Sequence, residues 1–248
     1  MSTPALRLSS VSRRFGALQA VRDVTFDVAP GERRAVIGPN GAGKTTLFNT
    51  ICGDFPPSSG RIELFGLDIT RARPHQRTRL GIGRTYQTSL LFNGLTVEQN
   101  LFVAVRGVQP HRWSVLRSGR DDPALAKARA LAERVQLAPL LGERVLNLSH
   151  GQRRQLEIGM ALAGDPKVLM LDEPAAGLSA GERPGLLAML RTLPRSVTLI
   201  LIEHDMDIAL PASDIVTVMK DGEVVVEAAP DRIEDDPTVQ AIYLGTGH

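Results

Sequence analysis

The chain has 248 residues, of which 43% are hydrophobic and 23% charged, and these proportions exclude a disordered, collagen-like or disulfide-scaffold protein. Its 29 Lys and Arg against 27 Asp and Glu leave a net charge of +2, too small to indicate nucleic-acid binding. The single cysteine, Cys52, permits no internal disulfide, and neither a membrane span nor a signal peptide is present in the sequence, so we expect the chain to stay in the cytosol.

Strand-like and helix-like patterns alternate along the chain. Alternating apolar residues predict strands over 21–28 and 61–65, and a β-type run over 33–38 precedes a glycine-rich loop and a helix over 45–52. The pattern from 96 to 163 is helical, with helices over 124–135 and 152–163. The runs 168–171 and 197–202 are almost wholly apolar, as in the central strands of a parallel sheet.

The last third ends with two further elements. Residues 215–219 and 223–227 flank Asp221-Gly222 and predict a hairpin, and 236–245 predict a short helix. We therefore expect three regions, namely an α/β core in two sequence pieces, a helical insertion over about 87–147, and a short C-terminal appendage.

A phosphate-binding loop is the clearest motif. The stretch Gly38-Pro39-Asn40-Gly41-Ala42-Gly43-Lys44-Thr45 fits G-x-x-x-x-G-K-[ST]. Glycines let backbone N–H groups surround a phosphate, the following helix presents its positive end, Lys44 brings a charge to the outer phosphates, and Thr45 offers a hydroxyl to Mg²⁺. The alternative is a glycine-rich turn that only caps a helix, but the position between a strand and a helix favours the phosphate loop.

Such a loop requires an acid at the end of a neighbouring strand. Asp172 and Glu173 follow the apolar run 168–171. We expect Asp172 to help hold Mg²⁺, mostly through water, and Glu173 to polarise the attacking water. Without the loop, two solvated acids that end a strand before Pro174 would explain the pair equally well.

A second helix start is predicted at Ser149. Ser149 and Gln152 have the spacing of a capping box, which alone would explain both residues. The functional interpretation is that Ser149 and the backbone of Gly151 are exposed and bind another phosphate group. One nucleotide cannot be shared by both helix starts within one compact chain, whereas a dimer could place the loop of one chain opposite Ser149 of the other.

These motifs resemble, in order and spacing, the ATP-binding subunit of ABC transporters. The resemblance rests on 38–45, Gln87, 148–152, 168–173 and His204, and it covers essentially the whole chain. It implies an α/β fold with a RecA-like P-loop core, an antiparallel β subdomain and a helical subdomain. The chain would then be a single nucleotide-binding domain, 1–248, with the core and antiparallel part in 1–86 and 165–229, the helical subdomain and signature helix in 87–164, and a tail in 230–248.

The resemblance also implies ATP and Mg²⁺ as ligands and assigns roles to residues. Glu173, His204, Gln87 and Lys44 would be catalytic, with Gln87 reaching Mg²⁺ and the water and His204 contacting the γ-phosphate. Thr45, Gln87 and Asp172 would hold the metal. The nucleotide would contact Phe15 through adenine stacking, for which core packing is the alternative, together with Gly38, Pro39, Asn40, Gly41, Ala42, Gly43, Lys44, Thr45 and Thr46, and in trans Ser149, Gly151 and Gln152.

Finer features resemble the branched-chain amino-acid importer type, namely 172–178, 201–206 and the tail 242–245. This implies an ATPase that powers import at the cytoplasmic membrane face, with a second ATP-binding subunit, permease subunits and, indirectly, a solute-binding protein, and without nucleic acid. The alternatives are urea or amide import, lipopolysaccharide export, or a soluble ABC ATPase. His150 and Ser179 depart from common family residues, glycine and aspartate. The segment from Arg106 to Arg120, with Trp113, is either a solvated loop or a permease or lipid contact.

Overall fold

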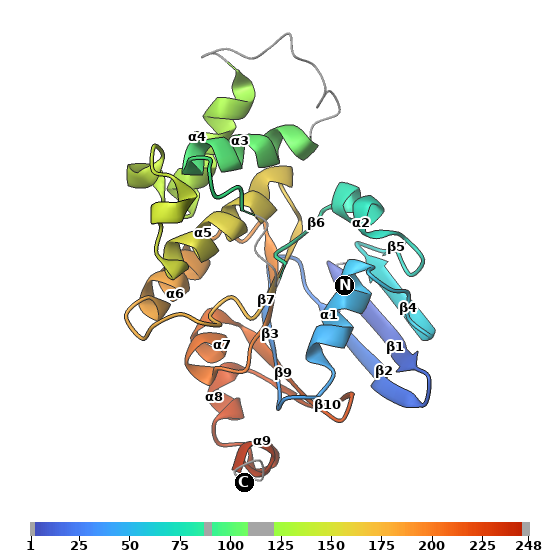
Figure 1. Cartoon of the computed structure of the whole chain (residues 1–248). Helices are drawn as coiled ribbons and strands as arrows, with labels where there is room; N and C mark the ends of the chain where they lie inside the picture. The colour runs from blue at the N-terminus through green and yellow to red at the C-terminus, as the bar shows by residue number, and fades with distance from the viewer. Residues whose placement is uncertain (1–2, 87–90, 109–121, 245–248) are drawn as a thin grey trace. The chain divides into compact units, whose positions relative to one another are not determined.

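The computed structural model describes residues 3–86, 91–108 and 122–244. They form two compact units, each assembled from separate stretches of chain (Figure 1). The first unit comprises Met1–Ile82, Lys167–Ala175 and Pro194–His248, and the second comprises Gly83–Pro166 and Ala176–Leu193. Among the described residues, no helix combines the length and the apolar character needed to cross a bilayer.

An antiparallel sheet lies in the first unit, in the order β2-β1-β4-β5. Its strands are β1 (Leu6–Phe15), β2 (Leu18–Val28), β4 (Ser59–Leu64) and β5 (Leu67–Asp68). The predicted strands over 21–28 and 61–65 are confirmed, whereas β1 was not predicted. Its register against β2 and β4 shifts near Ser10, whose φ is +50°. This irregularity interrupts the period of two that identifies a strand in the sequence.

The larger sheet has six strands in the order β10-β9-β3-β8-β7-β6. They are β3 (Arg33–Ile37), β6 (Ile82–Arg84), β7 (Val168–Asp172), β8 (Thr198–Ile202), β9 (Ile215–Lys220) and β10 (Glu223–Ala228). β3 pairs in parallel with β8 and β9, and β7 pairs in parallel with β8. All residues of β3, β7 and β8 are buried, as the continuous apolar runs predicted for β7 and β8. The hairpin of β9 and β10 is also confirmed.

Helices cover both faces of this sheet. On one face, α1 (Lys44–Cys52) packs through Leu47 and Ile51 into a core that includes Val36 of β3 and residues of the antiparallel sheet. On the other face, Ile37 packs with residues of α7 (Met206–Ala212), α8 (Pro230–Ile233) and α9 (Pro237–Leu244). The alternation of Val36 and Ile37 between the two cores therefore fixes the strand that leads into the phosphate loop. The unit also contains α2 (Pro74–Leu80).

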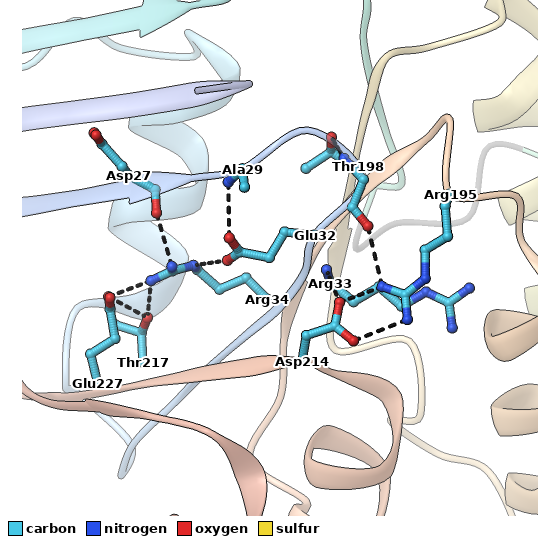
Figure 2. A network of polar contacts seen from close by, with 11 residues as sticks. Asp27, Ala29, Glu32, Arg33, Arg34, Arg195, Thr198, Asp214, Thr217 and Glu227 are labelled. Atoms are coloured by element: carbon cyan, nitrogen blue, oxygen red, sulfur yellow. Dashed lines mark hydrogen bonds and ion pairs between the residues drawn. The ribbon is translucent and has the colours of Figure 1, made fainter. Parts of the chain in front are cut away.

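A polar network surrounds the amino end of β3 (Figure 2). The buried Arg34 of β3 donates to Glu32 Oε1 at 2.8 Å, Thr217 Oγ1 at 2.9 Å and the carbonyl of Asp27 at 2.9 Å, and it pairs with Glu227. A second group centres on Asp214, which accepts the backbone N–H of Arg33 at 2.9 Å and pairs with Arg195. β3 is thus anchored to β9 and β10 at its start, which leaves its carboxyl end to position the loop.

The second unit is helical, as predicted for 96–163. Its helices are α3 (Val97–Val108), α4 (Pro123–Arg134), α5 (His150–Ala161) and α6 (Arg183–Thr192), with short 3₁₀ turns at Ala138–Leu140, Val145–Asn147 and Leu162–Gly164. The face of α4 predicted from its spacing is buried, through Ala124, Ala128 and Leu131. The apolar face of α4 is therefore its buried face, as expected of an amphipathic helix.

Candidate functional site

Three neighbouring strands of the first unit end beside one another. The order β3-β8-β7 places Gly38, Glu203 and Asp172 at consecutive carboxyl ends. Because adjacent strands lie ~4.8 Å apart, these ends lie within about 10 Å of one another. The parallel pairing therefore brings the predicted loop, the predicted acids and the predicted histidine to one edge of the sheet, which is where open α/β sheets bind ligands.

The loop is shaped by glycines that no other residue could replace. Gly43 has a φ of +95°, and a Cβ there would lie 2.3 Å from the carbonyl oxygen of Ala20. Gly38 has a φ of +148°, and its Cβ would lie 2.2 Å from the carbonyl oxygen of Met219. The loop therefore lies directly against the backbones of β2 and β9, and Asn40 and Gly41 remain exposed at its outer turn.

Lys44 is the first residue of α1 and is almost fully buried, with 5% of its surface exposed. Its ammonium donates to the carbonyls of Gly38 at 2.7 Å and Pro39 at 3.0 Å. Burial lowers the pKa of Lys44, and the carboxylates of Glu173, Asp172 and Glu203 oppose this shift. The lysine and the acids of the two neighbouring strands therefore interact electrostatically. Thr45 and Thr46 follow in the first turn of the helix and are half-buried.

The two acids have different surroundings. Asp172 ends β7 with 3% of its surface exposed. Glu173 lies in the left-handed region with a φ of +46°, its backbone N–H donates to the carbonyl of Ile202 at 2.9 Å, and its Oε1 lies 3.7 Å from Nδ1 of His204. A strained non-glycine backbone is typical of functional positions. The predicted water-polarising acid and the predicted γ-phosphate contact are thus neighbours.

Glu203 is a residue that the sequence analysis did not assign. It is fully buried, and its Oε1 accepts the backbone N–H of Ala175 at 2.8 Å while Oε2 accepts that of His204 at 3.3 Å. Burial raises the pKa of its carboxyl, and the nearby Glu173 raises it further. Glu203 therefore ties the segment after β7 to the segment after β8. The sequence signal is an acid that directly follows an apolar strand.

The donor chemistry around Lys44 fits a magnesium ion. Mg²⁺ takes one or two protein oxygens and completes its shell with phosphate oxygens and water. Thr45 offers a hydroxyl and Asp172 a buried carboxylate at this edge. Within residues 3–86, 91–108 and 122–244, no cluster of three or more His, Cys, Asp or Glu residues could hold a metal alone. Gln87, the third predicted ligand, lies outside the described residues, as does Trp113.

Phe15 is at the β1–β2 turn and lies outside the core, because 43% of its surface is exposed. Its ring packs edge-on against Phe55 at 5.3 Å, and the guanidinium of Arg13 lies 4.6 Å from its centroid. The core-packing alternative for Phe15 is therefore wrong, and adenine stacking on this ring remains a prediction.

The second predicted helix start lies in the second unit. Ser149 caps α5, with its Oγ accepting the N–H of Gln152 at 3.3 Å and the Gln152 side chain accepting the N–H of Ser149 at 2.9 Å, so the capping box is confirmed. Ser149 is exposed, but its hydroxyl and the N–H of Gly151 both donate to Glu182, each at 2.9 Å. An anion of the chain itself thus occupies the donors predicted to meet a phosphate.

The two departures from the family pattern both contact neighbouring backbone or side chains. His150 Nε2 lies 3.3 Å from the carbonyl oxygen of Ala176, and it contacts Gly177, where a Cβ would approach within 3.1 Å of that nitrogen. The Ser179 hydroxyl donates to Glu182 Oε2 at 2.9 Å. Neither substitution removes the backbone N–H of Gly151 from the start of α5.

Comparisons with known proteins agree with this architecture. The profile of the ABC transporter family matches residues 21–176. The chain is 38% identical to the high-affinity branched-chain amino acid transport ATP-binding protein BraF of Pseudomonas aeruginosa and 35% identical to LivG of Escherichia coli, over 99% of each chain in both cases. The solved ADP conformation of MJ1267, an ATP-binding cassette of an ABC transporter, matches with a TM-score of 0.85 and 31% identity over 98% of this chain and 99% of that one.

Proposed function

This chain belongs to the ABC transporter family as an ATP-binding subunit, and from that premise we propose that its catalytic site is the strand edge formed by Lys44, Asp172, Glu173 and His204. The observation that carries the proposal is the meeting of three strand ends, from β3, β8 and β7, around the buried Lys44. The RecA-like P-loop fold is the expected scaffold for this chemistry, and the chain acts as an ATPase of a transporter.

The hydrolytic step uses groups with separate tasks. Lys44 stabilises negative charge on the outer phosphates, and it leaves its carbonyl partners in the loop to do so. Glu173 accepts a hydrogen bond from the attacking water and takes its proton. His204, 3.7 Å from Glu173, holds the γ-phosphate beside that water. Thr45, Asp172 and Gln87 would hold Mg²⁺, which would supply positive charge to the reacting phosphate groups.

The complete site requires a second subunit in this proposal. The phosphate loop and the Ser149 helix start belong to different compact units of the chain, and each is an anion-binding helix start. We expect two subunits, identical or related, to hold two ATP molecules, each between the loop of one and Ser149 of the partner subunit. Permease subunits would anchor this dimer at the cytoplasmic face of the membrane, and residues 1–248 would act as one nucleotide-binding domain.

Branched-chain or other hydrophobic amino acids are the proposed cargo. BraF and LivG carry this assignment in their names and align over 99% of this chain. Cargo choice itself would lie with the permease and a solute-binding protein, because the proposed catalytic site holds only phosphate and metal ligands.

Replacing Glu173 tests the catalytic proposal. Glu173→Gln keeps the size and the hydrogen-bonding atoms of the side chain but cannot take a proton. We expect ATP hydrolysis to fall by about 10²–10⁴, the contribution of a general base, while ATP binding is retained. A phosphate-release assay and a fluorescent-nucleotide titration measure the two effects.

The control for that variant is Glu234→Gln, which changes an exposed glutamate of the same unit. It should hydrolyse ATP like the wild type. If Glu173→Gln also does so, Glu173 is not the base and the proposed site is wrong.

Reconstitution tests the cargo. The complex with its permease and solute-binding protein should show ATP turnover that leucine, isoleucine or valine stimulates and urea does not. Stimulation by urea alone would replace the amino-acid proposal with the amide-import alternative.

A further inference from the structure

Glu182 lies at the start of α5 as though it were a bound anion. Its Oε1 accepts two hydrogen bonds of 2.9 Å, one from the hydroxyl of Ser149 and one from the backbone N–H of Gly151. Charge-assisted bonds of this kind are roughly twice as strong as neutral ones. The carboxylate also lies at the positive end of a helix of 12 residues. All these residues belong to the second compact unit.

The absence of a side chain at Gly151 makes this approach possible. A Cβ at Gly151 would lie 3.1 Å from Glu182 Oε1 and 3.2 Å from Glu182 Cβ, closer than side chains ordinarily pack. Glu182 is therefore in close contact with the helix start, and it uses the donors that a phosphate would need.

The local turn accounts for only one of the two carboxylate oxygens of Glu182. Oε2 of Glu182 accepts the backbone N–H of Ser179 at 3.1 Å and its hydroxyl at 2.9 Å, in the turn that directly precedes α6. The two bonds to Oε1 come from residues 31 and 33 positions away. One carboxylate oxygen thus serves the Ser179 segment, and the other serves the start of α5.

We propose that Glu182 is a resident occupant of the Ser149–Gly151 phosphate site, which the γ-phosphate of ATP bound to the partner subunit has to displace. This inference rests on the proposed function, since it takes that helix start as the second phosphate contact. Two anions cannot share the same two donors, so nucleotide binding releases Oε1 of Glu182. Oε2 keeps its bonds to Ser179, and the Ser179 segment therefore responds when ATP is captured.

The charge of Glu182 is present at every physiological pH. The N–H groups of Gly151 and Ser179, followed by their neighbouring hydroxyls, lower the pKa of its carboxyl to about 2. The occupant is therefore an anion whenever the chain meets ATP, and it competes with the nucleotide under all working conditions.

ATP-driven dimer formation tests the proposal in the Glu173→Gln background, which retains bound ATP. Adding Glu182→Gln preserves the side-chain shape and removes the charge. We expect the ATP concentration at half-maximal dimer formation, measured by sedimentation, to fall by about three-fold or more, because a neutral amide is a weaker competitor for these donors. Glu133→Gln, an exposed glutamate of the same unit, is the matched control and should leave the midpoint unchanged.

An unchanged or raised midpoint in the Glu182→Gln variant overturns the proposed competition between Glu182 and the γ-phosphate. If the Glu173→Gln parent never dimerises with ATP, the proposed function is wrong instead. Glu182→Asp, whose carboxylate is one methylene shorter, is the second variant should the first not fold, and it should shift the midpoint in the same direction.

A measurement on the nucleotide-free chain is independent of hydrolysis and dimer formation. Titration with inorganic phosphate should shift the amide resonance of Gly151 in the Glu182→Gln variant and leave it in place in the wild type. An equal response of the two chains contradicts the proposal.

Discussion

At the residue scale, some residues of the site can be assigned a role from the sequence and others cannot. Gly38, Lys44 and Thr45 form one continuous motif, so their chemistry is visible in the sequence. Glu203 and Glu182 received no role from the sequence, because each also accepts a hydrogen bond from a residue 28 or more positions away. Their roles depend on which strands are neighbours and on which loop meets which helix. The roles of both acids could therefore be assigned only from the folded structure.

Glu203 gives a pH dependence of known sign. Its folded pKa is raised above the ordinary 4.5, so between these two values the folded chain binds more protons than the unfolded one. Stability must therefore fall as pH rises through that window. We expect Glu203→Gln to remove this decline, because the amide does not bind a proton in this pH range.

Urea unfolding of the wild type and the variant at a series of pH values from 4.5 upward measures this effect. The quantity compared is the slope of the free energy of unfolding against pH, which does not depend on the absolute stability of either chain. Parallel slopes would show that Glu203 does not hold a raised pKa in the folded chain.

At the element scale, hydrophobic period identified the central strands β3, β7 and β8 and the helices α1, α4, α5 and α9, whereas β1, α2 and α6 are among the elements that it missed. β1 has a register shift, and α2 (Pro74–Leu80) is almost entirely polar. The only buried residue of α2 is Arg77, which donates to the carbonyls of Thr50 at 2.8 Å and Ile51 at 2.6 Å, at the end of α1. A charged anchor produces no apolar pattern, so propensity and period could not predict this helix.

Arg77→Ala should destabilise the first unit. Arg77 also donates to the carbonyls of Ala72 at 2.9 Å and Thr70 at 3.1 Å, so its loss leaves several carbonyls without their donor. A cost of about 2–4 kcal/mol follows from ~1–3 kcal/mol for each fully buried group that loses its partner. Thermal unfolding measures it, with the exposed Arg79→Ala of the same helix as control. Equal melting of the two variants would contradict the anchoring role.

At the scale of the whole molecule, the family, the RecA-like fold and the transporter role followed from the order of the motifs, and the comparisons confirm them. The roles assigned to single site residues stay predictions. Gln87 lies outside the described residues, so its proposed link to Mg²⁺ rests on the resemblance alone.

Mixing two inactive chains tests the composite site. Lys44→Ala removes the loop cation, and Ser149→Arg blocks the second helix start. Each variant alone should lose hydrolysis by about 10²-fold or more. A mixed dimer contains one complete site, formed by Lys44 of one chain and Ser149 of the other, so the mixture should regain activity in a phosphate-release assay. A mixture as inactive as its components would exclude a shared site.

The central position of β3 has a consequence for synthesis on the ribosome. β3 ends at Ile37, yet its two neighbours, β8 and β9, begin only at Thr198 and Ile215. At ~20 residues per second, about nine seconds separate the emergence of the glycine motif from that of the strands that support it. Throughout that interval the nascent chain carries the motif without the strands that support it, so we expect it to bind no nucleotide until β8 and β9 have emerged.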